Sequence, residues 1–206
     1  MMASDQSPEY DERLANLQRL AQRIAASEAV TAIRGDSRLV FGTGNPMASL
    51  VLVGEAPGAD EEKQGRPFVG RAGRLLDDAL ERAGISRSDI WITNVVKVRP
   101  TEPGANDRRR NRPPTTEEKN IFRPWLEEEL RIIAPRSIVC VGATAAAALL
   151  GRKVKVTAAR GQWSDGPGGA QVLTTYHPAY LLRPFRDRDE RFQQLVEDLQ
   201  LAMQRE

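Results

Sequence analysis

Cysteine is almost missing from this sequence, in which Cys140 is the single thiol. One cysteine excludes a disulfide within the chain and is typical of a reducing compartment, so we expect a cytoplasmic protein. Long apolar runs are missing too, since no stretch approaches the roughly 20 residues of a membrane span. Residues 1–8 are polar and lack the apolar core of a signal peptide. These absences argue against a secreted disulfide scaffold and against a membrane partner.

A strong charge of one sign is also missing, because 30 Lys and Arg stand against 28 Asp and Glu. The charges are unevenly placed, however. Residues 97–112 carry Lys97, Arg99, Arg108, Arg109, Arg110 and Arg112 against only Glu102 and Asp107. A second basic group follows at Arg183, Arg186 and Arg188. Such clusters on a nearly neutral chain suit the phosphate backbone of a nucleic acid, although solvated basic loops have the same pattern.

The hydrophobic pattern predicts strands that alternate with helices. Strands are expected at 50–53, 90–96, 137–141 and 172–176, and helices at 8–28, 70–83, 116–133, 188–204 and, rich in alanine, between Gly142 and Gly151. Residues 36–47 are expected to form a loop. This alternation predicts an α/β fold, a three-layer α/β/α sandwich around a central, mainly parallel four-stranded sheet. We expect residues 1–206 to form a single domain, on which the helix and loop of residues 1–37 pack.

Two glycine-containing segments follow the first predicted strand. The sequence reads GEAPG at 54–58 and RPFVGRAG at 66–73. At the carboxyl edge of a parallel sheet, such a loop brings backbone N–H groups and one carboxylate close to a flat ligand. The spacing matches neither dinucleotide nor P-loop motifs, which disfavours a nucleotide cofactor. The only histidine lies in a third segment, TYHPAYLLR at 175–183, which leaves the last predicted strand.

Together these segments resemble the uracil-DNA glycosylase superfamily, most closely its thermophile-type iron–sulfur branch. The resemblance covers roughly residues 38–183. It implies a monofunctional DNA repair glycosylase that flips a nucleotide out of the stack and hydrolyses the N-glycosidic bond of uracil. The products are free uracil and an abasic site.

The resemblance also assigns roles in base recognition. Phe68 matches the family's stacking phenylalanine, although a lone Phe is compatible with core packing. Asn94 matches its base-reading asparagine, whose amide accepts from N3–H and donates to O4; the alternative is an asparagine that caps its own turn. Gly54 and Ala56 belong to the substrate-binding loop.

Two further residues are candidates for catalysis. His177 resembles the donor that stabilises charge at O2 of the departing base, and a neutral imidazole can serve if its other nitrogen is held by a neighbour. The alternative is a structural histidine. Glu55 is expected to position the attacking water or to stabilise the cationic sugar, or else to stabilise its own turn.

DNA contacts are expected from two segments. Asn111 and Arg112 match a family element near the DNA. In the histidine segment, Leu181 or Leu182 is expected to fill the gap left by the flipped base, and Arg183 to hold a phosphate. Packing of the two leucines beneath the loop is the alternative.

The sequence departs from this branch in two places. Ser27, Val30, Val98 and Ile121 occupy the positions of the four cysteine ligands. We therefore predict no cluster and no other cofactor, with apolar side chains packed where the cluster lies in relatives. Residues 101–110 form an insertion, which either enlarges the DNA-binding surface or is a mobile loop without contacts.

Two other functions stay open from the sequence. The chain is alternatively a non-catalytic binder of uracil-containing or damaged DNA, or a glycosylase for another deaminated base such as hypoxanthine or xanthine. One member of the superfamily binds uracil-DNA covalently through a loop histidine, which this sequence lacks. The expected partner is DNA, single- or double-stranded, and the expected oligomeric state is a monomer.

Overall fold

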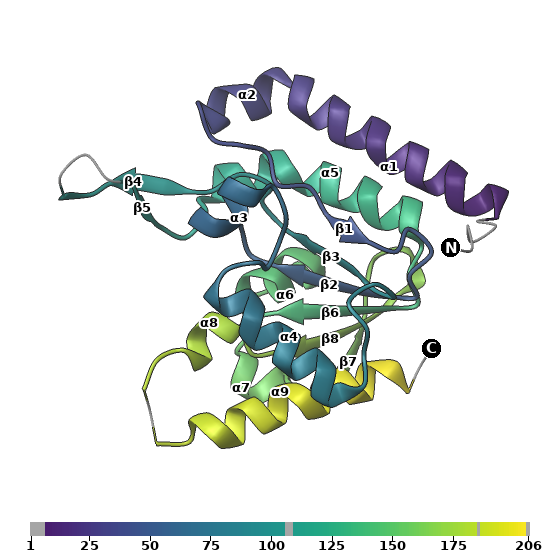
Figure 1. Ribbon diagram of the computed structural model, residues 1–206, viewed down its shortest axis with the longest axis vertical. Helices are drawn as coiled ribbons and strands as arrows, with labels where there is room; N and C mark the ends of the chain where they lie inside the picture. The colour runs from purple at the N-terminus through teal and green to yellow at the C-terminus, as the bar shows by residue number, and fades with distance from the viewer. Residues whose placement is uncertain (1–6, 106–108, 185, 205–206) are drawn as a thin grey trace, which may run out of the picture.

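The computed structural model describes residues 7–105, 109–184 and 186–204. Its centre is a sheet with the strand order β1-β3-β2-β6-β8-β7 (Figure 1). The strands are β1 (Thr43–Gly44), β2 (Leu50–Gly54), β3 (Trp91–Asn94), β6 (Ser137–Val141), β7 (Trp163–Asp165) and β8 (Gln171–Thr175). The four inner strands pair in parallel, whereas β1 and β7 pair antiparallel to β3 and β8. The predicted four-stranded parallel sheet is thus confirmed, with two short edge strands that the sequence analysis missed.

Helices cover both faces of the sheet, as predicted. One face carries α1 (Pro8–Ala26), α2 (Glu28–Arg34), α5 (Thr116–Ile133) and α6 (Ala143–Leu150), and the other carries α4 (Arg71–Ala83), α8 (Pro178–Leu181) and α9 (Arg188–Met203) (Figure 1). Shorter elements are α3 (Ala59–Gln64), α7 (Val156–Ala159), the 3-10 helix Pro167–Gly169 and the strands β4 (Thr101–Pro103) and β5 (Arg109–Asn111). Each face has its own apolar core, because the inner strands are buried on both sides.

The N-terminal helix differs from the prediction. It breaks at Ser27, which ends α1 and caps α2 by accepting a hydrogen bond from the backbone N–H of Val30. Leu17, Leu20 and Ile24 point into the core shared with α5, as their helical spacing indicates. The helices α1 and α2 therefore pack against α5 on the outer side of this face of the sheet (Figure 1).

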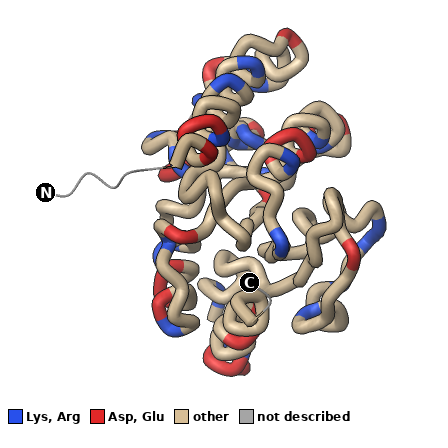
Figure 2. The backbone as a smooth tube through the Cα atoms, turned by 90° about the vertical axis from the view of Figure 1, so that its right-hand side faces the viewer, with Lys and Arg blue, Asp and Glu red and all other residues tan. Residues whose placement is uncertain are grey.

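The outer surface carries both signs of charge. Figure 2 shows acidic and basic positions interspersed along the outer helices. None of the helices in the described part of the chain is long and apolar enough to cross a membrane.

Strand register brings the loops that carry the candidate residues together. Gly54 at the end of β2 is paired with Asn94 at the end of β3, and Val141 at the end of β6 with Thr175 at the end of β8. Because the carboxyl ends of parallel strands share one edge, the loops that follow them meet there.

Candidate active site

A cavity of about 350 Å³ lies at this carboxyl edge. Its wall includes most of the residues that the sequence analysis selected, namely Glu55, Ala56, Phe68, Asn94, Asn111, Arg112 and His177. Gly54 lies directly beneath Phe68 and Asn94. By contrast, Leu181, Leu182 and Arg183 are not part of this wall. The predicted base-reading and catalytic residues therefore meet in one place.

Gly54 permits the close approach of Phe68 and Asn94, the two residues predicted to recognise the base. A Cβ atom at this position would lie 2.3 Å from Oδ1 of Asn94 and 2.5 Å from Cζ of Phe68. Both distances are far below van der Waals contact, so any side chain here would displace the amide or the ring. The glycine is thus required by packing and not by an unusual backbone angle.

Phe68 has a backbone conformation that non-glycine residues rarely adopt, with φ at 51°. Its loop is held by Arg87, which donates to the carbonyl oxygens of Phe68 at 3.0 Å and Pro67 at 2.6 Å. The ring lies 5.8 Å from the His177 ring, centroid to centroid, at an interplanar angle of 33°. A strained, externally held aromatic residue in a cavity wall is typical of a functional position.

Asn94 sits on a fully buried ion pair between Lys97 and Glu129. The Lys97 ammonium donates to the carbonyl oxygen of Asn94 at 2.9 Å and to the Thr93 hydroxyl at 2.6 Å. Glu129 in turn accepts from Thr93 at 3.1 Å and from the Trp91 indole at 2.9 Å. Burial lowers the pKa of Lys97, and the Glu129 carboxylate opposes that change. The pair therefore holds the end of β3, from which the Asn94 amide projects.

This ion pair corrects one part of the sequence analysis. Lys97 was counted in the basic segment that faces a phosphate backbone, but its side chain is 0% exposed. The sequence did contain a sign of this burial, because Lys97 lies between Val96 and Val98 in an otherwise apolar run.

His177 is held as a neutral Nε2–H donor. The backbone N–H of Ala179 donates to its Nδ1 at 3.1 Å, which makes His177 the cap of α8. Because Nδ1 accepts, the proton of a neutral ring resides on Nε2. Burial lowers the pKa of His177, and the charges of Glu55 and Glu61 only partly offset that effect. The lowered pKa favours the neutral imidazole, which is the form that the predicted donor role requires.

Glu55 is oriented by α6, the helix that follows the neighbouring strand β6. The Thr144 hydroxyl, in the first turn of α6, donates to Oε2 of Glu55. The backbone carbonyl of Glu55 accepts from Val96 at 3.0 Å, which continues the pairing of β2 with β3. The sequence analysis did not assign a role to Thr144. Its place two residues after Gly142, at the end of β6, was the signal.

Glu61 is a second residue that the sequence analysis missed. Its carboxylate accepts three backbone N–H groups, from Gly58 at 3.1 Å, Val69 at 2.9 Å and Gly70 at 2.7 Å. It thereby fastens the GEAPG loop to the loop of Phe68. An acid three residues after Gly58, at the start of a helix, is the sequence pattern of a capping box.

The insertion forms the β4–β5 hairpin, which extends from the body of the molecule (Figure 1). Arg99 and Arg109 both donate to Glu62 on α3, at 3.1 and 3.0 Å, and Arg110 pairs with Glu102 within the hairpin at 2.7 Å. Arg108 and Asp107 lie outside the described residues. The expectation of a mobile loop without contacts is therefore wrong for the described arginines. Their charge is only partly compensated, because Arg99 and Arg109 share the single carboxylate of Glu62.

The side chain of Arg112 bonds to other parts of the protein and fixes the position of the hairpin. Its guanidinium forms a two-pronged ion pair with Glu118, each bond 2.7 Å long, and its Nε donates to the carbonyl oxygen of Thr101 at 3.1 Å. The hydrogen bond from Arg112 lowers the pKa of Glu118. Glu118 also accepts from the backbone N–H of Thr115 and so caps α5. Arg112 thus joins the hairpin to α5, while the exposed Asn111 faces the cavity.

The predicted wedge residues have different surroundings. Leu181 is 0% exposed and belongs to the core under α4 and α9, which argues against a wedge at this position. Leu182 is half-buried and Arg183 is exposed. Tyr180, which was not selected from the sequence, is 39% exposed and stacks on Tyr176 with ring centroids 6.2 Å apart.

The four positions that the resemblance assigns to cluster cysteines carry residues that pack in the core or cap a helix. Val30 and Val98 lie in the core between α1, α5 and the sheet, and Ile121 packs against it. Ser27 caps α2. None of these side chains is a thiolate, so the residues do not fit an iron–sulfur cluster. Among the described residues, no group of His, Cys, Asp and Glu is arranged to hold a metal ion.

Comparisons with known proteins agree with this geometry. Residues 41–200 match the family model of the uracil DNA glycosylase superfamily. A type-4 uracil-DNA glycosylase of Thermotoga maritima is 40% identical over 185 residues, which cover 89% of this chain and 91% of the relative. A type-5 enzyme of Thermus thermophilus is 32% identical and covers 71% and 73%. The crystal structure of wild-type SMUG2 from Pedobacter heparinus shares the fold, with a TM-score of 0.56 at 13% identity over 86% of this chain and 96% of that one.

The fold and the family match together define a glycosylase-type α/β protein. The chain belongs to the uracil-DNA glycosylase superfamily. A second type-4 enzyme, from Pyrobaculum aerophilum, is 39% identical over 175 residues, which cover 82% of this chain and 85% of the relative. The resemblance stated from the sequence is thereby confirmed.

Proposed function

We propose that this chain is a monofunctional uracil-DNA glycosylase, which hydrolyses the N-glycosidic bond and releases free uracil. The observation that carries this proposal is the meeting of Phe68, Asn94, His177 and Glu55 around one cavity at the carboxyl edge of the sheet. Family membership supports the same reaction. The abasic site that remains is the substrate of later steps in base excision repair.

Recognition of uracil follows from two side chains. The Phe68 ring stacks on the flat base, a contact typically worth about 1–3 kcal/mol. The Asn94 amide accepts from N3–H and donates to O4, a pattern that cytosine reverses. Lys97 holds the backbone carbonyl of Asn94, so the end of β3 from which the amide projects is fixed when the cavity is empty.

Bond cleavage depends on the other two side chains, His177 and Glu55. As the C1′–N1 bond breaks, its electron pair moves onto the base, and His177 Nε2–H donates to the developing charge at O2. The Glu55 carboxylate stabilises the cationic sugar and accepts a proton from the water that attacks C1′. Thr144 keeps this carboxylate on the sugar side of the cavity. The departing uracil takes up one proton at N1, which balances the hydrolysis.

We assign the DNA contacts to predicted residues whose side chains are at least partly exposed and can therefore reach a strand. Asn111 contacts the strand at the cavity, Arg183 holds a phosphate, and Leu182 enters the gap left by the flipped nucleotide. Arg112 orders the hairpin that carries Asn111. Buried Leu181 supports the loop from beneath.

We further propose that the enzyme works without a cofactor, as a cytoplasmic monomer on single- or double-stranded DNA. Apolar packing of Val30, Val98 and Ile121 supports the first part, since it supplies the order that a cluster would otherwise give to this region. Activity that survives a strong metal chelator, in a colourless preparation, is the expected result. A visible absorption band that is lost together with activity would contradict it.

The test uses oligonucleotides with one uracil, as a single strand and opposite guanine, followed by hot alkali. We expect alkali-dependent breaks at the uracil. Glu55→Gln and His177→Ala should slow cleavage by at least about 100-fold with DNA binding kept, because each removes transition-state stabilisation. Asp78→Asn, an exposed carboxylate on α4, is the matched control and should leave the rate unchanged.

The same experiment, repeated with hypoxanthine or xanthine in place of the uracil, separates the two other functions. Binding without alkali-labile sites would favour a non-catalytic binder. Faster release of hypoxanthine or xanthine than of uracil would favour the other glycosylase, and would contradict the pairing of Asn94 with uracil.

A further inference from the structure

A second and larger cavity, of about 640 Å³, lies between α5 and α6. We call it the α5–α6 groove. Its floor is apolar and contains Leu126, Ala147, Ala148 and Leu149. No step of the proposed reaction uses this groove.

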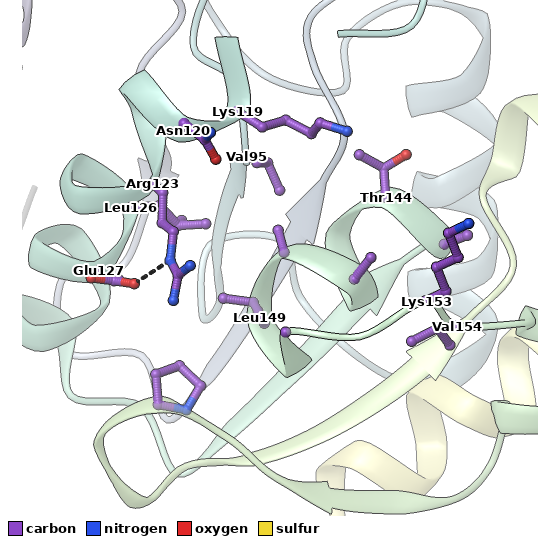
Figure 3. Close-up of a pocket in the computed structure, with 15 residues that line it drawn as sticks. Val95, Lys119, Asn120, Arg123, Leu126, Glu127, Thr144, Leu149, Lys153 and Val154 are labelled. Atoms are coloured by element: carbon purple, nitrogen blue, oxygen red, sulfur yellow. Dashed lines mark hydrogen bonds and ion pairs between the residues drawn. The ribbon is translucent and has the colours of Figure 1, made fainter. Parts of the chain in front are cut away.

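The groove carries positive charge on both walls. Lys119 projects from α5, and Lys153 from the segment after α6. Figure 3 shows both ammonium groups directed toward the end of the groove where Thr144 lies. Within the described part of the chain, neither ammonium forms an ion pair, whereas Arg123 is neutralised by Glu127 at 2.8 Å. The excess charge at this end is therefore positive, and it matches an anionic occupant.

The groove adjoins the uracil cavity. Thr144 lines it and also donates to Glu55. Val95 lines it as well, directly after Asn94, and donates from its backbone N–H to Gly54 at 2.9 Å. A molecule whose reacting group lies in the uracil cavity thus meets the groove immediately beyond the wall formed by Thr144 and Val95.

We propose that the α5–α6 groove receives the DNA strand that flanks the uracil, with phosphates at Lys119 and Lys153 and sugars and bases on the apolar floor. The inference rests on the proposed function, because it takes DNA to be held at the neighbouring cavity. DNA fits better than an acidic protein, since one continuous polymer then accounts for both cavities. A positively charged groove that follows the backbone is the common device for binding single strands.

The test compares two single-stranded substrates. One carries a single nucleotide on each side of the uracil and is too short to reach the groove, and the other extends by about ten nucleotides on each side, within the site sizes of single-strand binding proteins. For Lys119→Ala/Lys153→Ala we expect kcat/KM to fall about tenfold on the long substrate and to stay unchanged on the short one. The slope of log affinity against log salt should flatten by about 1.4, or 0.7 for each lost phosphate contact on a single strand.

The matched control is Lys155→Ala, an exposed lysine two residues from Lys153 that does not line the groove. It should leave both substrates unaffected. Equal losses on the short and long substrates, or an unchanged salt slope on the long one, would overturn the proposal and leave the groove to another partner. Wild-type protein that cleaves neither substrate would instead refute the proposed function. The short substrate also shows that the double variant is folded.

Discussion

Removal of the Lys97 ammonium should be the most damaging single change beneath the site. In Lys97→Met, Glu129 would stay buried without its counter-charge, and the carbonyl oxygen of Asn94 would lose its donor. Loss of one partner of a buried ion pair typically costs about 3–5 kcal/mol. At about 2–4 °C per kcal/mol for a chain of this size, the melting temperature should fall by about 6–20 °C.

The assay is reversible unfolding in urea, together with uracil release by the folded fraction. Lys97→Met should lower the free energy of unfolding by that amount, and the surviving enzyme should discriminate less between uracil and cytosine, since Asn94 is less firmly held. The double variant Lys97→Met/Glu129→Leu should regain only part of the stability, because it removes both charges but leaves the buried donors of Trp91 and Thr93 without their acceptor. It should not regain the discrimination. A loss below about 1 kcal/mol in the single variant would refute the reasoning that this pair is a dry, mutually dependent unit.

Three further predictions concern single side chains. The chain has one histidine, so the ring signals of an NMR titration belong to His177 alone, and its pKa should lie below the ordinary value of about 6.5. The unfolded state then binds more protons, so that stability falls as the pH drops below that value. Leu182→Ala should weaken cleavage of duplex substrate more than of single strands, whereas Leu181→Ala should mainly reduce the melting temperature. Burial raises the pKa of Cys140 to about 12, so a thiol reagent should label it only after denaturation; rapid labelling of native protein would contradict its place in β6.

The parallel sheet and the main site residues were predictable because they depend on local pattern. Short apolar runs, each followed by a distinctive loop, placed Asn94 near the end of one strand and His177 directly after another before any contact was known. The register of the strands then brought them together. Break and cap signals were also present at Ser27, where serine precedes glutamate, but the continuous helical spacing on either side concealed them.

Long-range partners were not predictable in the same way. Lys97 and Glu129 are 32 positions apart, and Thr144 and Glu55 are 89 apart. Nothing in the local sequence states which acid meets which cation. For the same reason the basic segment looked more open than it is, since Glu62, Glu118 and Glu129 approach it from other elements. Edge strands as short as β1 are likewise set by their partner and not by their own two residues.

If this site breaks the glycosidic bond of uracil, the free base must leave the DNA. The most direct measurement is the amount of free uracil released from a labelled oligonucleotide, followed by chromatography, with one portion of the DNA examined on a denaturing gel without heat. The account predicts many turnovers of free uracil per enzyme molecule, intact strands until alkali is added, and almost no release by Glu55→Gln. Bound but unprocessed DNA, or a protein–DNA adduct that survives denaturation, would contradict it.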